Sequence, residues 1–477
     1  MLVFIIQQVA TPVCITILKR GDIIKTTPFR MVSIIRDNML KRKMEKQLIA
    51  WKNSTNRKPL IIKGCRQCGK TFSVVKFAEE NYENVIYLNF FANPDYAAVF
   101  SGALDVDSVT MMITALLGAD ARFVPQKTIL ILDEIQECPE ARTALKFFKL
   151  DGRYDVIGTG SLLGVEGYGH SPRSIPVGYE TVITMYPLDF EEFLWANGIH
   201  ERLIDGLRDH LKSKTPVEEA LHKRYRELLL QYVAVGGMPD VVQTFVDTKQ
   251  MNTVLQMQRD IIRSYEDDMV KYADDKDKPL IRECFQSIPK QLAKENKKFQ
   301  YSVVKKGSTA AKFAGSLQWI EDAGITKRCY NLRATELPLD GNASDDIFKV
   351  YMVDTGLFVS MLEDGTQFDI LSGNLLGYKG AIFENLAADF FAKMGRKLYY
   401  YHKDSGLEID FFIRWRGKCT PVEVKARQGN AKSLKTVMKN QSVYHVEQAV
   451  KLGDYNVGEE NNVLTLPLYM GFLLDEN

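Results

Sequence analysis

Short apolar runs alternate with amphipathic stretches through the first part of the chain. The runs cover residues 60–62, 84–90, 128–132 and 154–158. Runs of this length predict strands that are buried on both faces of a parallel sheet, and the stretches between them have helical periodicity. Strands and helices in alternation indicate an α/β fold with right-handed crossovers. The pattern therefore predicts an α/β core at residues 39–198.

The pattern then becomes helical and later mixed. Asp189 is expected to cap a helix, and residues 199–275 are expected to form a helical lid that two glycines and a proline interrupt at 235–239. Between 276 and 340, three short helical stretches and a β-like segment suit a winged helix. Residues 341–477 return to strands and helices, which predicts a separate α/β domain at the C-terminus.

A glycine-rich loop joins the first predicted strand to a helix. Residues 64–71 read Gly-Cys-Arg-Gln-Cys-Gly-Lys-Thr, a G-x-x-x-x-G-K-[ST] pattern that curls backbone N–H groups around phosphate oxygens at a helix N-terminus. Lys70 is expected to reach the β- and γ-phosphates of ATP, and Thr71 to bind Mg²⁺. The residues expected to bind the nucleotide are Gly64, Cys65, Arg66, Gln67, Cys68, Gly69, Lys70, Thr71 and Phe72.

Two acidic residues follow the third predicted strand. Asp133 is expected to hold Mg²⁺ together with Thr71, and Glu134 to orient and deprotonate the attacking water, because phosphoryl transfer depends on positioning and charge compensation. In the alternative interpretation, the two acids only cap a helix that Pro139 opens. The catalytic set expected here is Lys70, Asp133, Glu134 and Ser161.

The strand at 154–161 ends in small polar residues, so that Thr159 or Ser161 would lie beside the γ-phosphate. The order of phosphate loop, Asp-Glu strand and polar strand end resembles the AAA+ class of P-loop ATPases. Such enzymes usually take an arginine from a neighbouring subunit to stabilise transition-state charge, which implies a homo-oligomer. The candidates, each of which also fits a solvated surface arginine, are Arg142, Arg153 and Arg173.

Composition and charge place few limits on function. A chain of 477 residues is too long to fold around a single hydrophobic core and suggests about three domains. A net charge of +2 gives no whole-chain reason to expect nucleic acid binding, so that any such site must be a local patch. The odd number of cysteines, seven, suits a reducing cytoplasm better than a disulfide framework.

Two of these cysteines lie inside the phosphate loop as Cys65-x-x-Cys68. The chain has no second such pair and no paired histidines to complete a zinc site, so a metal is not expected there. We interpret both residues as occupants of variable loop positions. As a hypothesis, oxidation of the two thiols would distort the phosphate loop.

The first 38 residues are expected to be an extension outside the fold. They begin with an apolar stretch, but Gln7 and Pro12 interrupt it and no cleavage pattern follows, so it fits neither a signal peptide nor a membrane span. Met31, Met39 or Met44 could be the initiator. We therefore expect a cytoplasmic protein without a membrane segment.

The most basic stretch lies in the expected winged helix. Such a stretch suits phosphate contacts in a DNA-binding module, although a solvated lysine-rich face is an equal alternative. Its lysines are Lys290, Lys294, Lys297, Lys298, Lys305, Lys306 and Lys312.

A second chemical centre is predicted near the C-terminus. Two strands joined by a turn at 416–418 place Asp410 opposite Glu423 and Lys425, with Glu384 on an upstream helix. Carboxylates that hold Mg²⁺ and a lysine that polarises water suit phosphodiester cleavage. The set resembles the PD-(D/E)xK nuclease core, and the alternative is an exposed acidic and basic sheet face.

Together these segments resemble the bacterial and archaeal AAA-type ATPases that carry a C-terminal DUF4143 domain. The resemblance runs from about Met39 nearly to the end. Besides the phosphate loop it rests on Leu132–Gln136, Gly160-Ser161, Tyr186–Phe193, Gly236–Pro239 and Asp354–Leu357. It implies an ATPase core, a helical and winged-helix middle and a restriction-endonuclease-like C-terminal domain. Tyr179 stands where members often have a basic residue, which leaves Arg173 as a substitute.

Three functions follow from these features. The first is a Mg²⁺-dependent ATPase whose hydrolysis drives a conformational change of the C-terminal domain on DNA. The second is an ATP-gated nuclease. The third is a signalling or scaffold ATPase whose C-terminal domain binds a protein partner.

Overall fold

The computed structural model describes residues 40–118, 121–161, 178–270, 273–294, 297–307, 309–374, 379–426 and 431–475. The expected N-terminal extension at 1–38 and Arg173 lie outside the described residues. Everything below belongs to the compact unit that begins at Leu40.

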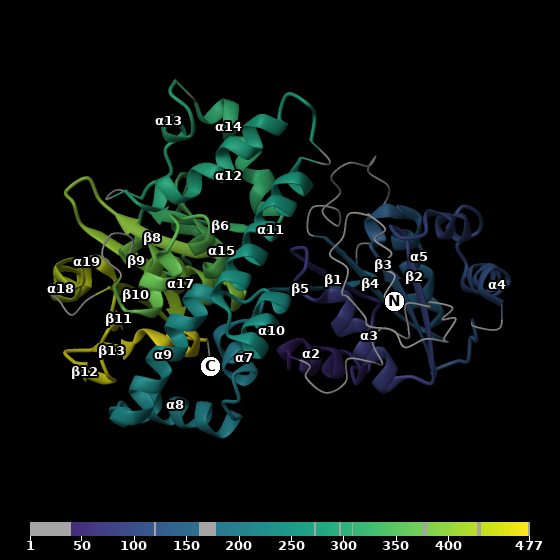
Figure 1. Cartoon of the computed structure of the whole chain (residues 1–477), viewed down its shortest axis with the longest axis horizontal. Helices are drawn as coiled ribbons and strands as arrows, with labels where there is room; N and C mark the ends of the chain where they lie inside the picture. Colours follow the sequence, from purple (N-terminus) through teal and green to yellow (C-terminus); the bar gives the residue numbers. More distant parts are fainter. Residues whose placement is uncertain are drawn as a thin grey trace, which may run out of the picture. The chain divides into compact units, whose positions relative to one another are not determined.

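The first part of this unit contains a five-stranded parallel sheet (Figure 1). Its strand order, β2-β3-β4-β1-β5, places β1 between β4 and β5 and confirms the P-loop NTPase fold. The four predicted strands are present, whereas the edge strand β5 was not predicted. The bounds are β1 (Leu60–Gly64), β2 (Asn84–Asn89), β3 (Thr128–Asp133), β4 (Asp155–Ser161) and β5 (Thr181–Met185).

Helices cover this sheet because their apolar stripes match its buried strands. All six residues of β3 are buried, and its Leu130 and Leu132 belong to the same core cluster as Val109, Ile113 and Leu145 of the helices. The elements are α2 (Lys43–Lys52), α3 (Lys70–Asn81), η1 (Pro94–Phe100), α4 (Val106–Leu117), η3 (Ile135–Glu137) and α5 (Pro139–Asp151).

Five helices follow the sheet. Asp189 caps the first as expected, because its side chain accepts a hydrogen bond from the Glu192 amide while the Glu192 side chain accepts one from the Asp189 amide. The expected turn separates α9 from α10. The helices are α7 (Phe190–Ala196), α8 (Glu201–Ser213), α9 (Glu219–Val235), α10 (Pro239–Thr248) and α11 (Met251–Met269).

After α11 come three helices, and the described residues beyond them form a mixed eight-stranded sheet with the order β12-β13-β11-β10-β9-β8-β6-β7, with further helices between its strands. The helices are α12 (Lys278–Leu292), α13 (Tyr301–Val304) and α14 (Ala310–Asp322). The strands are β6 (Thr326–Leu332), β7 (Ala343–Met352), β8 (Leu398–His402), β9 (Glu408–Trp415), β10 (Lys418–Lys425), β11 (Ala449–Gly453), β12 (Gly458–Glu460) and β13 (Val463–Pro467).

The segment expected to be the β part of a winged helix is a strand of this sheet. β6 pairs with β7 and, through a parallel register, with β8. The expected boundary between residues 340 and 341 therefore falls within one sheet. Periodicity could not reveal this, because the β8 partners of β6 lie about seventy residues further along the chain.

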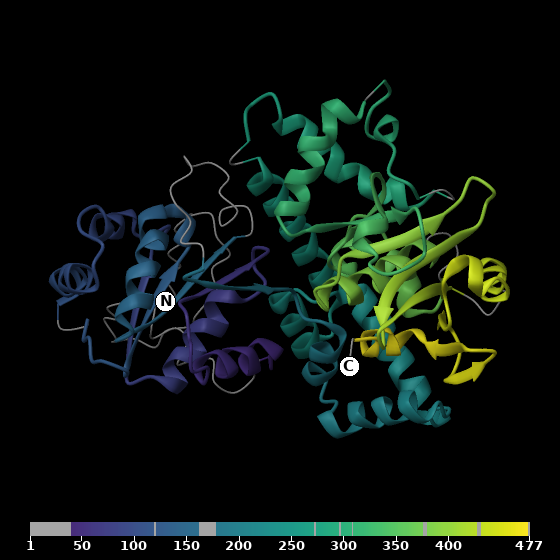
Figure 2. The ribbon, with the colours of Figure 1, turned by 180° about the vertical axis from the view of Figure 1, so that it is seen from behind.

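α17 (Lys379–Lys393) packs on β7, β8 and β10 of the sheet (Figures 1 and 2). Nearly all of its residues are buried, which places any polar side chain on it inside the domain. The other short elements are η4 (Asp340–Asn342), α15 (Thr355–Ser360), α16 (Thr366–Leu371), α18 (Lys432–Lys439), α19 (Gln441–Tyr444) and η5 (Leu468–Leu473).

Candidate functional site

The phosphate loop has the geometry that its glycines predict. Gly69 has φ 91°, in the left-handed region, and is the residue that precedes α3. A Cβ on Gly64 would lie 2.3 Å from the carbonyl oxygen of Met185 in β5. The loop can therefore turn tightly from β1 into the N-terminus of α3, where backbone N–H groups favour an anion.

Lys70 spans the loop from the first turn of α3. Its Nζ donates hydrogen bonds to the carbonyl oxygens of Gly64, at 3.1 Å, and Cys65, at 2.9 Å. The side chain is buried, so its ammonium group is held over the loop rather than in solvent. A phosphate in the loop would meet this charge directly.

Asp133 lies at the carboxyl end of β3 and accepts hydrogen bonds from four side chains. Thr71 Oγ1 lies 3.1 and 3.2 Å from its two carboxylate oxygens, which brings together the two residues expected to bind Mg²⁺. The other donors are the Tyr87 hydroxyl at 2.5 Å, Asn89 Nδ2 at 2.9 Å and the Thr159 hydroxyl. Asp133 is 3% exposed, so these donors fix its orientation.

The hydroxyl of Thr71 and the carboxylate of Asp133 fit Mg²⁺, which prefers oxygen ligands and usually completes its shell with water and phosphate oxygens. Within the described part of the chain, no three His, Cys, Asp or Glu side chains are grouped so that they could hold a metal ion. A cation at this site would thus depend on the nucleotide for further ligands.

Glu134 follows Asp133 in a left-handed conformation, with φ 53°, that a residue with a side chain rarely adopts. Its carboxylate accepts a hydrogen bond from Gln136 Nε2 at 2.5 Å. Neither acid caps α5, since the residue before its Pro139 is Cys138. The capping interpretation is therefore wrong.

Arg42 and Tyr265 donate hydrogen bonds to backbone carbonyl groups of the phosphate loop. The sequence did not reveal either contact. Arg42 Nη1 donates to the Cys68 carbonyl at 3.0 Å, and its Nε contacts Glu192 of α7 at 3.1 Å. The Tyr265 hydroxyl in α11 donates to the Arg66 carbonyl at 2.8 Å. Arg42 precedes the first helix as part of a charged run, and no local pattern links it to the loop.

The two loop cysteines are buried side by side. The hydrogen bond between the two thiols, with the positive charges of Lys70 and Arg42, lowers the pKa of Cys68 to about 6. The same hydrogen bond and burial raise the pKa of Cys65. A thiol with a lowered pKa next to a second thiol is an arrangement that favours oxidation.

The arginine candidates are paired within the chain. Arg142 Nη2 lies 2.6 Å from Glu180, and Arg153 Nη2 lies 2.6 Å from Asp107. The arginine donor to another subunit's nucleotide stays a prediction. Arg173 lies outside the described residues.

Three of the motif segments meet at one buried point. The Gly237 amide donates to Asp354 Oδ2 at 2.6 Å, and the Gly237 carbonyl accepts from the Leu188 amide at 2.6 Å. Lys393 Nζ donates to the Leu188 carbonyl at 3.0 Å and pairs with Asp389 at 2.7 Å. The Gly-Gly-Met-Pro segment is thus a turn clamped by two distant segments.

The predicted C-terminal centre assembles across β9, β10 and α17. Lys425 Nζ contacts Glu423 Oε1 at 2.5 Å, and Asp410 Oδ2 accepts a hydrogen bond from the Val424 amide at 2.8 Å. The paired register of β9 and β10 ends at Val422 opposite Phe411, so that Asp410 and Glu423 are the next residues on the two adjacent strands. Burial, together with Glu384 and Glu423, raises the pKa of Asp410, and burial raises that of Glu423.

Two further lysines enter this centre. Lys297 pairs with Glu384 Oε1, and Lys349 of β7 lies 3.8 Å from Glu384 Oε2 and 2.6 Å from Glu408. Burial opposes ionisation of Glu384, but Lys349 and Lys297 lower its pKa. The buried Lys349 has a raised pKa because these carboxylates outweigh the effect of burial. Neither lysine was predicted to belong to the site.

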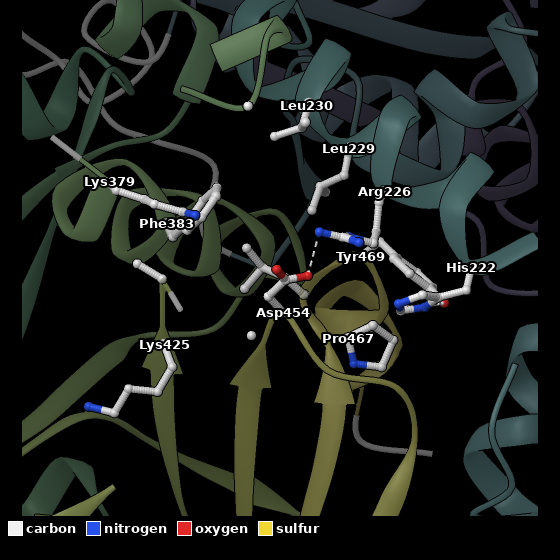
Figure 3. A pocket seen from close by; sticks show the side chains of 14 residues that line it. His222, Arg226, Leu229, Leu230, Lys379, Phe383, Lys425, Asp454, Pro467 and Tyr469 are labelled. Carbon is white, nitrogen blue, oxygen red and sulfur yellow. Dashed lines mark hydrogen bonds and ion pairs between the residues drawn. The ribbon is translucent and has the colours of Figure 1, made fainter. Parts of the chain in front are cut away.

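A hollow with a volume of about 110 Å³, open on one side, lies beside this centre, at the carboxyl ends of the parallel strands β10, β11 and β13 (Figure 3). Arg226 of α9 pairs with Asp454 at 2.7 Å, and His222 shares a 2.8 Å hydrogen bond with the Tyr469 hydroxyl. In Figure 3 the Lys425 ammonium points away from these pairs. The rest of the lining is largely apolar, so the hollow specifies no class of ligand.

The lysines of the basic stretch do not form one free surface. Lys305 pairs with Glu283 at 2.9 Å, Lys294 contacts Gln300 at 3.3 Å, and Lys297 enters the carboxylate cluster. DNA binding by this stretch stays a prediction.

Among the described residues, no helix is both long enough and apolar enough to cross a membrane.

Comparison with protein families gave three matches. A model described as an AAA domain, AAA_14, matches residues 56–194, and two domains of unknown function match residues 226–367 (DUF8612) and 379–469 (DUF4143). The search of curated proteins gave no match.

Several solved structures are similar in part. A Walker-type ATPase of Pyrococcus abyssi is 12% identical, with 68% of this chain and 97% of that chain covered and a TM-score of 0.42. The ORC2 protein of Aeropyrum pernix is 13% identical, with 72% and 97% covered and a TM-score of 0.35. The RuvB branch migration motor of Thermotoga maritima is 12% identical, with 61% and 90% covered and a TM-score of 0.29.

The family matches coincide with the two centres that the sequence predicted. The AAA model covers the phosphate loop and the Asp-Glu strand end, and the DUF4143 model covers Glu384, Asp410, Glu423 and Lys425. Membership of the PD-(D/E)xK nucleases stays a prediction. The chain thus contains a region that matches the AAA_14 family, with a P-loop NTPase fold, and a C-terminal region that matches the DUF4143 family.

Proposed function

We propose that the chain is a Mg²⁺-dependent ATP hydrolase in which Lys70, Thr71, Asp133 and Glu134 bind and cleave the nucleotide. The observation that carries this proposal is the hydrogen bond between Thr71 and Asp133, at 3.1 Å, under a phosphate loop that ends at a helix N-terminus. Oxygen ligands from the first turn of α3 and from the end of β3, together with a buried ammonium group, are what a nucleoside triphosphate with Mg²⁺ requires.

Each residue has a separate task in this reaction. When ATP binds, Lys70 gives up its hydrogen bonds to the Gly64 and Cys65 carbonyl oxygens. Its ammonium group then neutralises negative charge on the β- and γ-phosphates. Glu134 accepts the proton of the attacking water, and Gln136 orients its carboxylate. Mg²⁺, when bound through Thr71 and Asp133, neutralises charge on the leaving phosphates. Ser161, at the end of β4, is proposed to lie beside the γ-phosphate.

The test is Glu134→Gln. It should bind ATP as tightly as the wild type but lose hydrolysis by a factor of roughly 10²–10⁴, the usual contribution of a general base. Glu137→Gln, the same change three residues along in η3, is the matched control and should keep hydrolysis. Equal hydrolysis by Glu134→Gln and wild type would remove Glu134 as the base.

We further propose that hydrolysis changes the conformation of the C-terminal part, in association with DNA. Arg42 and Tyr265 support this coupling, because each holds a carbonyl of the phosphate loop and Tyr265 belongs to α11. Phosphate contacts would make DNA binding steeply salt dependent, so titrations at several salt concentrations, with and without a non-hydrolysable ATP analogue, test the association. A flat salt response would favour a protein partner instead.

A second candidate is an ATP-gated nuclease centred on Asp410, Glu423 and Lys425. It is favoured by the hydrogen bond from the Val424 amide to Asp410, which joins the two strands beside Glu423, and by the contact between Glu423 and Lys425. Supercoiled and branched DNA with Mg²⁺ or Mn²⁺ is the assay. Cleavage that persists in both Glu423→Ala and Lys425→Ala would exclude this centre.

A further inference from the structure

The carboxylates of the C-terminal centre are already compensated by lysines of the same chain. Four acids, Glu384, Glu408, Asp410 and Glu423, lie together with three lysines, Lys297, Lys349 and Lys425. The described residues offer no group of acidic, His or Cys side chains set to hold a metal ion. Buried acids need a counter-ion, and ammonium groups provide it here.

The three lysines differ in how firmly they are placed. Lys349 belongs to β7 and its side chain is 1% exposed, and Lys425 belongs to β10 and its side chain is 29% exposed. Lys297 lies between α12 and α13, outside any helix or strand, and its side chain is 14% exposed. Lys297 is therefore the one of these three lysines whose backbone no helix or strand holds, so that its withdrawal needs the least rearrangement of the fold.

The cluster also retains one open acceptor. Glu423 Oε2 is buried and has no hydrogen-bond partner among the described residues, although Glu423 Oε1 contacts Lys425. Glu384 Oε2 accepts from the Tyr351 hydroxyl at 3.1 Å, and Glu384 Oε1 is taken by Lys297. Removal of Lys297 would leave one acceptor oxygen on Glu384 and one on Glu423, together with the nearby Asp410.

We infer that Lys297 is a tethered counter-ion that excludes a divalent cation from the carboxylate cluster, so that this centre rests in a metal-free, inactive state until Lys297 is withdrawn. The inference rests on the second candidate function and adds a switch to it. It also explains why the acids expected to hold a metal are occupied by lysines in this conformation.

The test measures the affinity of the protein for Mn²⁺. The electron paramagnetic resonance signal of the free ion reports how much Mn²⁺ remains unbound. All proteins carry Asp133→Asn to remove the cation of the nucleotide site. Lys297→Gln should raise Mn²⁺ affinity by roughly tenfold or more, equivalent to a change of about 1.4 kcal/mol. Lys297→Arg, which keeps a cation, should match the parent, and Lys297→Gln with Glu384→Gln should lose the gain.

A second measurement needs no change at Lys297. In the parent protein, saturating Mn²⁺ should increase the labelling of Lys297 by an amine-reactive reagent, detected by mass spectrometry, while the fully buried Lys349 stays unlabelled. Unchanged Mn²⁺ affinity in Lys297→Gln, or tight binding by the parent without labelling of Lys297, would overturn the inference. The nuclease candidate would survive that result if wild-type protein cleaved DNA and Glu423→Ala did not.

Discussion

The Tyr87 hydroxyl gives a sharp test of how the sheet prepares Asp133 for Mg²⁺. Tyr87 in β2 donates a 2.5 Å hydrogen bond to Asp133 Oδ2 and is one of four donors on this carboxylate. Burial and the charge of Asp133 raise the pKa of Tyr87, so that it stays a neutral donor. Tyr87→Phe removes this donor and keeps the ring.

Two effects are expected from Tyr87→Phe. Loss of a hydrogen bond to a charged group should lower the free energy of unfolding by about 1.5–3 kcal/mol. Loss of a residue that orients a metal-binding carboxylate should weaken Mg²⁺ binding by roughly 10- to 100-fold. The assay is ATP hydrolysis at saturating ATP across a range of free Mg²⁺, with thermal unfolding of the same samples.

Tyr82→Phe is the matched control. The Tyr82 hydroxyl donates a 2.7 Å hydrogen bond to Asp155, which begins β4 at the end of the sheet opposite to Asp133. This variant should lose comparable stability and keep the Mg²⁺ dependence of the wild type. If both variants shift the Mg²⁺ midpoint equally, or if Tyr87→Phe leaves it unchanged, orientation of Asp133 by Tyr87 is refuted.

Three other outcomes are expected. Lys70→Ala should abolish detectable binding of Mg-ATP in calorimetry, because no other ammonium group lies over the loop carbonyls of Gly64 and Cys65 in the described structure. Asp354→Ala should cost about 2–4 kcal/mol of stability, since it removes the cap of α15 and leaves the Gly237 amide unpaired, whereas Asp354→Asn should cost less in the same denaturant titration. Diamide should join Cys65 to Cys68 and suppress ATP binding until dithiothreitol restores it; joined thiols with unchanged binding would contradict this.

The parts of the fold that follow local rules could be predicted from the sequence. The loop before α3 needs glycines, and the turn between β9 and β10 uses Arg416 and Gly417 with φ 50° and 74°, a two-residue hairpin that residues 416–418 indicated. The four predicted strands of the first sheet are apolar enough to be recognised without any knowledge of their partners.

The parts that depend on distant partners could not be predicted. β6 was assigned to another domain because its pairing with β8 leaves no local signal. Arg42 and Lys297 contact groups 26 and 87 residues away. Among 62 basic and 60 acidic residues, no spacing rule selects these pairs, whereas the polar ends of adjacent strands could have identified Asn89 as a neighbour of Asp133.

The two centres differ in the kind of groups that surround their acids. Asp133 is held by hydroxyl and amide donors from Thr71, Tyr87, Asn89 and Thr159, all of which are neutral. The Asp133 carboxylate is therefore held in one orientation while its negative charge is not neutralised, so that it can still attract a divalent cation. Glu384 is held by two ammonium groups, which cancel its charge. The same residue type can thus be ready for a metal at one site and closed to it at the other, and withdrawal of one lysine is the smallest change that would make the second site resemble the first.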